Sequence, residues 1–196
     1  MKLVLARHTE TEWNRERKTQ GRKNPPLNKK GREDAALLAE KLRGHGIQFI
    51  VSSDLLRAMQ TAGIISRILG VSFSLSSQLR ECCFGKIEGH TRQEAAELFG
   101  SDVSQDLNDP TFQKYDFRRF GGESCNEVFT RHLDALERIM KAGLGEPLLI
   151  VGHGRGLCTL LAGFGLPPLP QQGEFTTITL SETELRTASL RIAATS

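Results

Sequence analysis

The stretch LVLARHTET at residues 3–11 and the stretch LLIVGHG at residues 148–154 decide the fold. Each is a short apolar run that leads into a histidine, His8 in the first and His153 in the second. Such runs, bounded by turn residues, are typical of buried strands in a parallel sheet. Ligands of an open α/β sheet bind beyond the carboxyl ends of its strands. We therefore expect the cation of Arg7 and the two imidazoles at one anion site.

Strand and helix patterns alternate outward from these two runs. Apolar spacing predicts strands over 2–6, 47–52 and 148–151, extended segments over 71–75 and near 79, and a terminal strand pair over 175–180 and 185–192. Helical spacing predicts helices over 29–43, 54–69, 91–99, 123–142 and 157–163. This order predicts an α/β fold, a three-layer sandwich with a mostly parallel central sheet, helices on both faces and an antiparallel C-terminal edge.

Polar residues stand where three of these helices begin. Asn28 and Asp54 are expected to accept hydrogen bonds from the first helical turns that follow them. Thr91 is followed three residues later by Glu94, which predicts a capping box.

Length and composition limit the class of protein. The 196 residues predict one domain over 1–196, with the polar, irregular segment 100–122 as a cover or small insertion. The net charge of +3, with no basic stripe among aromatic residues, argues against a nucleic-acid partner. No apolar run approaches the roughly 18 residues of a membrane span, and no secretory signal precedes the first strand. The four cysteines show no CxxC spacing. We expect a cytoplasmic protein with reduced thiols, a monomer or homodimer.

Side chains that suit phosphoryl transfer follow other predicted strands. Arg57 lies beyond the strand 47–52, and Glu81 follows the segment near residue 79. Planar guanidinium groups bind phosphoryl oxygens in pairs. A neutral imidazole can attack phosphorus, and a protonated carboxyl can supply the proton for the leaving group. No metal-ligand spacing or phosphate-binding glycine loop accompanies them, so we expect no metal and no cofactor.

Five motifs in this order resemble those of the histidine phosphatase superfamily, also called phosphoglycerate-mutase-like. They are RHTET at 7–11, SDLLRAMQTA at 53–62, LRE with GKIEG at 79–89, GGES at 121–124 and VGHG at 151–154. Asn14, Gly21, Pro26-Leu27 and Gly31 continue the match. The resemblance covers roughly residues 2–192, and the order of all five motifs makes it specific.

The resemblance implies a catalytic set and a phosphate site. His8 would be the nucleophile that becomes phosphohistidine, and Glu81 would be the acid for the leaving group and then the base for water. The residues that would bind the transferring phosphate are Arg7, Asn14, Arg57 and His153. We expect one ring nitrogen of His8 to donate to a backbone carbonyl, which fixes its tautomer, and we expect His153 to be cationic.

Further residues are candidates for contact with the other end of the substrate. Gln20, Gly21 and Arg22 lie in the loop after the first strand, and Gly154 and Arg155 follow His153. Arg155 would either line the pocket and select an acidic substrate or lie solvated at the start of a helix. Other basic residues are candidates for which a solvated surface position is the alternative: Lys23, Lys114, Arg118 and Arg119.

The chain departs from the family pattern at Thr9, where the superfamily motif has glycine. A β-branched residue is poorly suited to positive φ, which puts the local backbone in question. Cys82 and Cys83 after Glu81 are expected to pack as small apolar side chains, with a redox switch as the alternative. His45 and His132 are expected at the surface.

The superfamily includes phosphatases and phosphoglycerate mutases. Its cofactor-dependent mutases are similar to one another in a longer insertion and a His-Tyr pair after the catalytic glutamate. Here Cys82 and Cys83 follow Glu81, and the residues 82–152 leave little room for a mutase lid before His153. The resemblance thus implies a phosphatase for a small phosphorylated metabolite, similar to α-ribazole or broad-specificity phosphatases. The alternatives are a cofactor-dependent phosphoglycerate mutase and a non-catalytic phosphate-binding domain.

Overall fold

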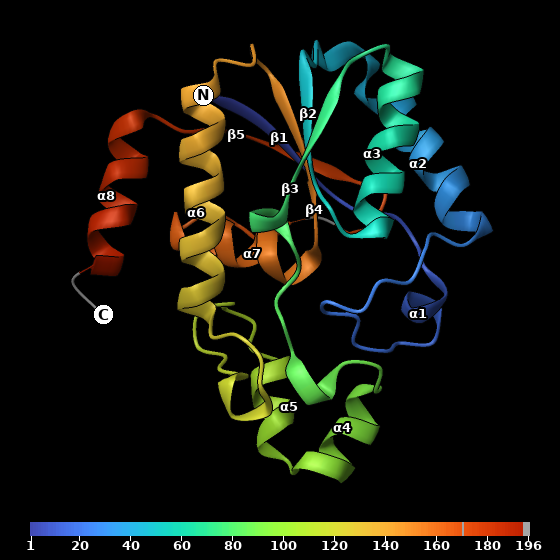
Figure 1. Cartoon of the computed structure of the whole chain (residues 1–196), viewed down its shortest axis with the longest axis vertical. Helices are drawn as coiled ribbons and strands as arrows, with labels where there is room; N and C mark the ends of the chain where they lie inside the picture. Colours follow the sequence, from blue (N-terminus) through green and yellow to red (C-terminus); the bar gives the residue numbers. More distant parts are fainter. Residues whose placement is uncertain (170, 194–196) are drawn as a thin grey trace.

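The computed structural model describes residues 1–169 and 171–193, with a five-stranded sheet between layers of helices (Figure 1). The strand order is β3-β2-β4-β1-β5, and β5 is antiparallel to β1 while the other neighbours are parallel. The strands are β1 (Lys2–Arg7), β2 (Phe49–Ser53), β3 (Phe73–Ser76), β4 (Leu148–Gly152) and β5 (Phe175–Thr179). The predicted fold class, including the antiparallel edge, is confirmed.

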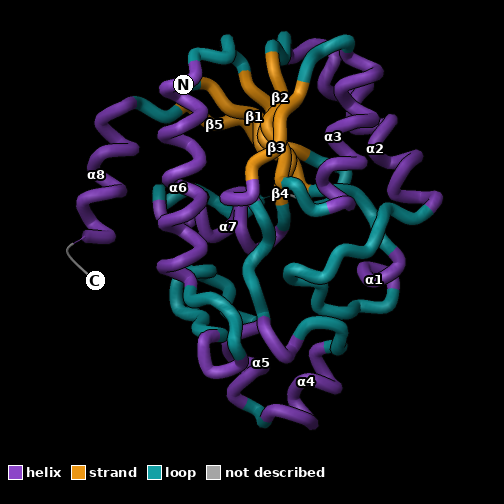
Figure 2. Tube along the Cα trace, viewed as in Figure 1, coloured by secondary structure: helices purple, strands orange, loops and turns teal. Residues whose placement is uncertain are grey.

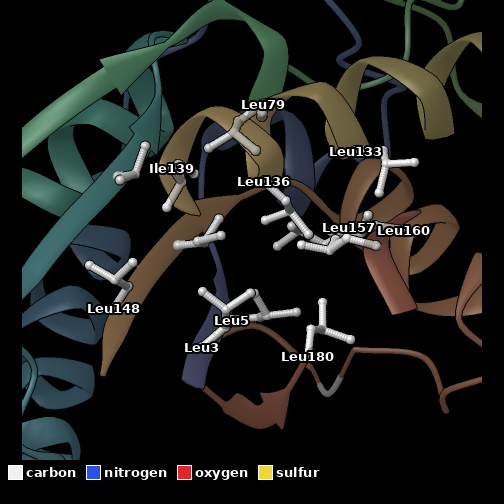
Figure 3. Packing of buried hydrophobic residues seen from close by; sticks show 14 of the residues in the cluster. Leu3, Leu5, Leu79, Leu133, Leu136, Ile139, Leu148, Leu157, Leu160 and Leu180 are labelled. Atoms are coloured by element: carbon white, nitrogen blue, oxygen red, sulfur yellow. The ribbon is translucent and has the colours of Figure 1, made fainter. Parts of the chain in front are cut away.

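Alternate residues of the strands face two separate cores. Leu3 and Leu5 of β1 point to the core shared with α6, α7 and α8 (Figure 3), whereas Val4 and Ala6 point to the core shared with α2 and α3. The helices are α1 (Glu12–Arg15), α2 (Lys29–Leu42), α3 (Leu56–Leu69), α4 (Arg92–Phe99), α5 (Asp102–Leu107), α6 (Cys125–Ala142), α7 (Gly154–Gly163) and α8 (Glu182–Ala193). Single 3-10 turns are Arg43–His45, Ser77–Leu79, Gly85–Ile87 and Arg118–Phe120.

The strand register gathers the polar strand ends. Arg7 at the end of β1 pairs with Gly152 at the end of β4, and Ser52 of β2 pairs with Val151. The backbone N–H of His8 donates to the carbonyl of Gly152 at 2.9 Å, which continues the ladder one residue beyond β1. The sheet therefore places the residues after β1, β2 and β4 together at one edge, as expected of parallel strands.

Two of the three predicted N-caps are confirmed. The side chain of Asn28 accepts from Gly31 N–H, and Thr91 forms a capping box with Glu94. The prediction for Asp54 is wrong, because Leu55 occupies the N-cap position of α3 and makes no side-chain cap. Asp54 instead accepts a hydrogen bond from Nε of Arg80 at 2.7 Å, since this cation lies within its reach across the fold.

Two other predictions are corrected. Residues 185–192 do not form a strand but belong to α8, because Leu185 and Ala188 lie three residues apart and pack on the core beside α6. The segment 100–122 is not wholly irregular, since it contains α5 and a 3-10 turn. Val103, Tyr115 and Phe117 bury a small apolar cluster there, and Figure 2 shows α4 and α5 beyond one end of the sheet. Within the described ranges, no helix has the length and apolar character needed to span a membrane.

Candidate active site

A cavity of about 1200 Å³ opens at the end of β1 and the start of α7. Its wall contains nine of the predicted site residues: Arg7, His8, Asn14, Gln20, Gly21, Arg57, Glu81, Gly154 and Arg155. These residues come from positions that span most of the chain, and the parallel sheet brings them together. Arg22 and His153 are absent from the residues that line this cavity.

His8 is buried at the end of β1 with a defined tautomer. Its Nδ1 lies 2.7 Å from the carbonyl oxygen of Thr9, which can only accept, so Nδ1 carries the proton and donates. The hydrogen bond expected to a backbone carbonyl is therefore present. Nε2 consequently keeps its lone pair, and it accepts from Nε of Arg57 at 3.2 Å. The nitrogen with the lone pair is the one that can act as a nucleophile.

The surroundings of His8 keep its ring neutral. Burial, followed by the positive charges of Arg57 and Arg7, lowers the pKa of His8 well below its ordinary value of 6.5. The hydrogen bond to Thr9 favours the charged ring but is the smallest of these effects. A neutral imidazole close to two guanidinium groups has the chemistry to act as a nucleophile toward a bound anion.

Arg57 is held in place from three directions. It projects from α3 with no exposed surface and donates to the carbonyls of Gly21 and Lys23, each at 2.8 Å, as well as to His8. Burial lowers its pKa to about 10, against the opposing charge of Glu81, so it stays cationic near neutral pH. Arg7 is half-buried, and its buried Nε has no hydrogen-bond partner among the described residues. These two cations make the cavity electropositive.

His153 lies beneath the cavity surface. It is fully buried, its ring centroid is 5.2 Å from that of His8, and its Nε2 lies 2.8 Å from Oγ of Ser53. Burial, followed by the charges of Arg57 and the other nearby rings and cations, lowers its pKa well below 6.5. Desolvation and positive neighbours therefore disfavour the cationic form of His153 that was predicted as a partner of the phosphate. Its Nδ1 has no partner in the described part of the chain.

Glu81 is held by backbone donors at the start of α7. Its Oε1 accepts from the N–H groups of Cys82 and Gly156 at 2.9 and 2.8 Å, and its Oε2 accepts from Arg155 N–H at 3.2 Å. The first N–H groups of a helix lack partners within the helix, so they are available for a carboxylate. The carboxyl group lies at the cavity wall with a fixed orientation.

Three predicted residues of the segment after β1 also lie in this wall. Asn14 belongs to α1, and its side-chain oxygen accepts from the backbone and hydroxyl of Thr11 and from the amide of Gln172. Gln20 is buried, and its side-chain oxygen has no partner in the residues that the structure describes. Gly21 has a φ of +50°, and a Cβ there would lie 2.1 Å from the Glu88 carboxylate. Glycine is therefore required where this loop carries the carbonyl that holds Arg57.

Thr9 causes no backbone strain. Left-handed backbone outside glycine occurs in the described chain at Arg17 and Phe112, and not at Thr9. Its hydroxyl donates to the carbonyl of Gly31 at 2.7 Å, and its N–H donates to Oγ1 of Thr61 at 3.2 Å. The hydroxyl ties the loop after β1 to α2, so the concern raised by the absence of glycine is resolved.

Of the two positions considered for Arg155, the structure shows the one at the pocket. It lines the cavity, but its guanidinium carbon lies 4.6 Å from the ring centre of Tyr115 and within 6 Å of the rings of Phe84, Phe112 and Phe117. Its Nη2 donates to the carbonyl of Leu107 at 2.8 Å. Cation–π contacts of this kind fix a guanidinium where it also packs.

Several predicted substrate contacts lie elsewhere. Arg22 lies outside the cavity wall in this structure, and its guanidinium pairs with Glu123 at 3.0 Å. Arg118 and Arg119 pair with Asp116 and Asp106. Lys23 and Lys114 are exposed and lie outside the cavity wall.

Cys82 is buried in the apolar cluster of the segment 100–122, and burial raises its thiol pKa well above the ordinary value. Its neighbour Cys83 is half-buried, and both are free thiols. The expected packing role for Cys82 is confirmed. A buried protonated thiol is a poor nucleophile.

Three residues near the site were missed or misplaced by sequence reasoning. His45 is exposed as expected, but His132 is fully buried, because it lies on the inner face of α6 four residues from both Val128 and Leu136. Arg131, beside it, contacts the backbone of Glu81. Gln172 donates to the carbonyl of His8 at 3.2 Å. The helical spacing of His132 from Val128 and Leu136 was the one signal in the sequence that indicated its burial. No local pattern indicated that Arg131 and Gln172 lie near the site.

Comparison with known proteins identifies relatives of the whole fold. A probable phosphoglycerate mutase GpmB of Salmonella paratyphi A is 36% identical over 168 residues, which are 85% of this chain and 76% of the relative. The structure of Bacillus stearothermophilus YhfR is 32% identical with a TM-score of 0.80 and covers 92% of both chains. A mycobacterial glucosyl-3-phosphoglycerate phosphatase is 25% identical with a TM-score of 0.79, covering 94% of this chain and 93% of its own.

The model of one family matches nearly the full length of the sequence, over residues 3–193. That span includes every residue of the cavity wall described above. The chain belongs to the histidine phosphatase superfamily, branch 1.

Proposed function

We propose that this protein is a metal-independent phosphomonoester hydrolase that works through a phosphohistidine intermediate on His8. The observation that carries the proposal is the hydrogen bond from Nδ1 of His8 to the carbonyl of Thr9, which leaves the Nε2 lone pair for attack. Arg7 and Arg57 supply fixed positive charge at the same cavity. Preorganised charge of this kind stabilises the transferring phosphoryl group without reorganisation during the reaction.

In the first step, the Nε2 lone pair of His8 forms a bond to phosphorus while the bond from phosphorus to the ester oxygen breaks. The N–H of Arg57 that now contacts Nε2 turns to a phosphoryl oxygen, and Arg7 binds another. Glu81, carrying a proton, transfers it to the departing ester oxygen, so the product leaves as an alcohol. The now cationic phosphohistidine ring keeps its Nδ1–H bonded to Thr9.

In the second step, the carboxylate of Glu81 takes a proton from water. The water oxygen bonds to phosphorus, the bond between Nε2 and phosphorus breaks, and inorganic phosphate is released. Splitting the displacement in two lets one carboxyl group serve as acid and then as base. His153, Asn14, Gln20, Gly21 and Gly154 are proposed phosphate or substrate contacts.

A phosphatase is favoured over a mutase by the segment between Glu81 and His153. The residues 82–152 include the short helices α4 and α5 and the long helix α6, and they leave no long insertion to enclose a phosphoglycerate between two transfers. The names of the relatives divide between the two reactions, since one is a probable phosphoglycerate mutase and another a glucosyl-3-phosphoglycerate phosphatase. The substrate that we propose is a small phosphorylated metabolite.

One assay tests the proposal. A panel of phosphomonoesters is incubated with the protein in EDTA, and 3-phosphoglycerate is followed for both phosphate release and isomerisation. We expect phosphate release that is insensitive to EDTA, together with an acid-labile phosphohistidine that is absent from the His8→Ala variant. Isomerisation faster than phosphate release would assign the mutase reaction instead. Phosphate binding without turnover of any ester would indicate a binding domain.

A further inference from the structure

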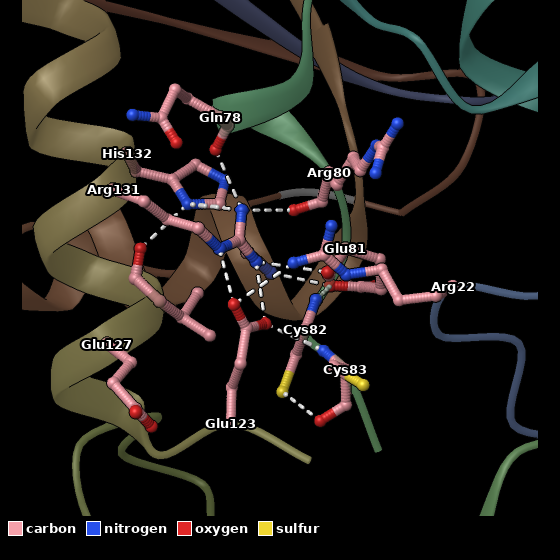
Figure 4. Close-up of polar contacts among 12 residues, drawn as sticks. Arg22, Gln78, Arg80, Glu81, Cys82, Cys83, Glu123, Glu127, Arg131 and His132 are labelled. Carbon is pink, nitrogen blue, oxygen red and sulfur yellow. Dashed lines mark hydrogen bonds and ion pairs between the residues drawn. The ribbon is translucent and has the colours of Figure 1, made fainter. Parts of the chain in front are cut away.

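The motif GGES at 121–124 has no role in the chemistry described above, yet its glutamate makes an ion pair that is largely buried. Glu123 and Arg131 meet through two hydrogen bonds, Nε to Oε1 at 2.9 Å and Nη2 to Oε2 at 3.1 Å (Figure 4). Their side chains are only 19% and 12% exposed, the lowest combined exposure among the ion pairs between side chains of the described residues. A paired guanidinium and carboxylate of this geometry form a rigid unit.

The remaining donors of Arg131 bind the backbone on which Glu81 stands. Nη1 donates to the carbonyls of Gln78 and Arg80 at 2.7 and 2.6 Å, and Nη2 donates to the carbonyl of Glu81 itself at 3.0 Å. One guanidinium thus contacts three carbonyls within four residues (Figure 4). Arg131 therefore fixes the chain up to and including the carboxyl-bearing residue.

Glu123 fixes the chain on the other side of Glu81. Its Oε2 accepts from Cys83 N–H at 2.8 Å, and its own N–H donates to the Cys83 carbonyl at 2.8 Å. A Cβ on Gly122 would lie 2.4 Å from that carbonyl, so glycine is needed for the close approach. Burial raises the pKa of Glu123, but the hydrogen bonds and charge of Arg131 outweigh it and lower the pKa below its ordinary value, which keeps the carboxylate ionised.

The same carboxylate reaches the loop that holds Arg57. Nη2 of Arg22 donates to Oε1 of Glu123 at 3.0 Å, and the neighbouring residue Gly21 supplies a carbonyl to Arg57. Arg22 N–H also donates to Oε1 of Glu88 at 3.0 Å, which binds this loop to the segment after Glu81. The pair of Glu123 and Arg131 therefore connects the loops that carry the phosphate-binding cation and the carboxyl group.

Resting on the proposed phosphatase reaction, we infer that Glu123 and Arg131 are positioning residues that set the location of the Glu81 carboxyl group for proton transfer to the leaving group. Neither side chain lines the cavity, so each acts through the backbone of residues 78–83. Three N–H groups orient the carboxylate, and this ion pair fixes the backbone from which it projects. A displacement of about 1 Å in such a group can cost on the order of 100-fold in rate.

The test compares two substrates that differ in their need for an acid. An alkyl phosphate requires Glu81 to protonate its alkoxide, whereas p-nitrophenyl phosphate loses a phenolate that departs without a proton. The single-turnover rate of phosphohistidine formation isolates this first step from hydrolysis. We expect Glu123→Gln to lower the rate with the alkyl phosphate by about tenfold or more and to change the aryl rate little. Arg131→Lys, which keeps the charge but loses the guanidinium fork, is the second variant and is expected to act alike.

Two controls separate positioning from general damage to the fold. Asp106→Asn removes a carboxylate whose side chain is 16% exposed. Like Glu123, it binds an arginine, here Arg119, and a backbone N–H, here that of Asp116. We expect this variant to leave the ratio of alkyl to aryl rates unchanged. In the Glu81→Gln background, Glu123→Gln should cause no further loss with the alkyl phosphate, because the group it positions is already absent.

Equal losses on both substrates, or a full additional loss in the Glu81→Gln background, would overturn the positioning role. If instead the wild-type protein forms no phosphohistidine with either ester, the proposed phosphatase reaction fails first. The two failures are therefore distinguishable. Thermal unfolding of each variant confirms that the compared proteins are folded at the assay temperature.

Discussion

Nε of Arg57 donates to Nε2 of His8 at 3.2 Å, so a buried cation contacts the lone pair of the expected nucleophile. The arrangement favours a neutral, aligned imidazole, and it places the proposed phosphate-binding cation beside the nitrogen that we propose attacks phosphorus. Both residues are almost completely buried, His8 at 2% exposure and Arg57 at 0%. The charge state of His8 and the contacts of Arg57 therefore lead to direct tests.

The first prediction concerns the protonation of His8. Burial and the charges of Arg57 and Arg7 lower its pKa well below 6.5, so the ring stays neutral as pH falls through that value. We expect nitrogen NMR of the labelled protein to show the Nδ1–H tautomer of His8 unchanged between about pH 7.5 and about pH 5.5. The denatured chain, whose histidines titrate near 6.5, provides the reference. A His8 signal that titrates together with the denatured reference would contradict the prediction.

The second prediction concerns Arg57. Its three hydrogen bonds, to His8, Gly21 and Lys23, use the planar fork of the guanidinium, which lysine cannot reproduce. We expect Arg57→Lys to lower kcat/KM for a phosphomonoester by about 100-fold or more, because the fixed, charge-assisted N–H contact to the transition state is lost. Inhibition by inorganic phosphate should weaken in the same variant. Unchanged phosphate inhibition would place this cation outside the phosphate site.

The third prediction concerns Thr9. Its hydroxyl donates to Gly31, and its backbone avoids the left-handed region, so glycine would offer no relief of strain. We expect Thr9→Gly to reduce the free energy of unfolding by about 1–3 kcal/mol, from the lost hydrogen bond and the greater flexibility of glycine. Thr9→Ser keeps the hydroxyl and should lose clearly less. Urea unfolding checks both variants, and a Thr9→Gly protein as stable as wild type would refute the proposed contact.

The fourth prediction concerns His132. Burial, followed by the charge of Arg131, lowers its pKa to about 3, and its Nε2 has no partner in the described ranges. Between pH 6.5 and pH 3 the unfolded chain therefore binds one proton more than the folded chain at this residue. The free energy of unfolding then falls with decreasing pH by about 1.4 kcal/mol per unit for each such histidine.

Replacement of His132 by leucine removes this contribution. We expect His132→Leu to lose less stability than wild type when the pH is lowered from about 7 to about 5, as measured by urea unfolding at both values. The variant lacks the bond from Nδ1 to the Val128 carbonyl, so its stability at pH 7 is the internal reference. Equal pH dependence in the two proteins would show that His132 is already charged in the folded state.

Local sequence patterns were sufficient to predict the structural features that depend on residues close together in the sequence. The apolar runs before His8 and His153 identify β1 and β4, because burial on both faces requires continuous apolar side chains. The capping box at Thr91 identifies the start of α4, because its partners lie three residues apart. The motifs also placed Glu81 and Arg57 at the cavity, since parallel strands end at one edge.

Prediction was wrong where the outcome depends on which surfaces meet. Asp54 could have capped α3, but it binds Arg80, which no local pattern brings near. Apolar and polar residues alternate enough over 185–192 to suggest a strand. The segment is instead part of helix α8, whose residues Leu185 and Ala188 are buried beside α6. Arg22 was predicted as a substrate contact. In the structure it lies outside the cavity wall and pairs with Glu123, which is 101 residues away in sequence.

By itself, the sequence determined the family and the strands β1 and β4, and it indicated His8 as the proposed nucleophile, because these depend on short-range periodicity and on motifs with fixed spacing. The tertiary structure alone decided that Thr9 is unstrained, that burial and positive neighbours lower the pKa of His153, and that Arg131 contacts the backbone of Glu81. The physical reason is that desolvation, charge and hydrogen bonding at a buried group are set by residues distant in the chain. Only the closed fold brings those residues within contact distance.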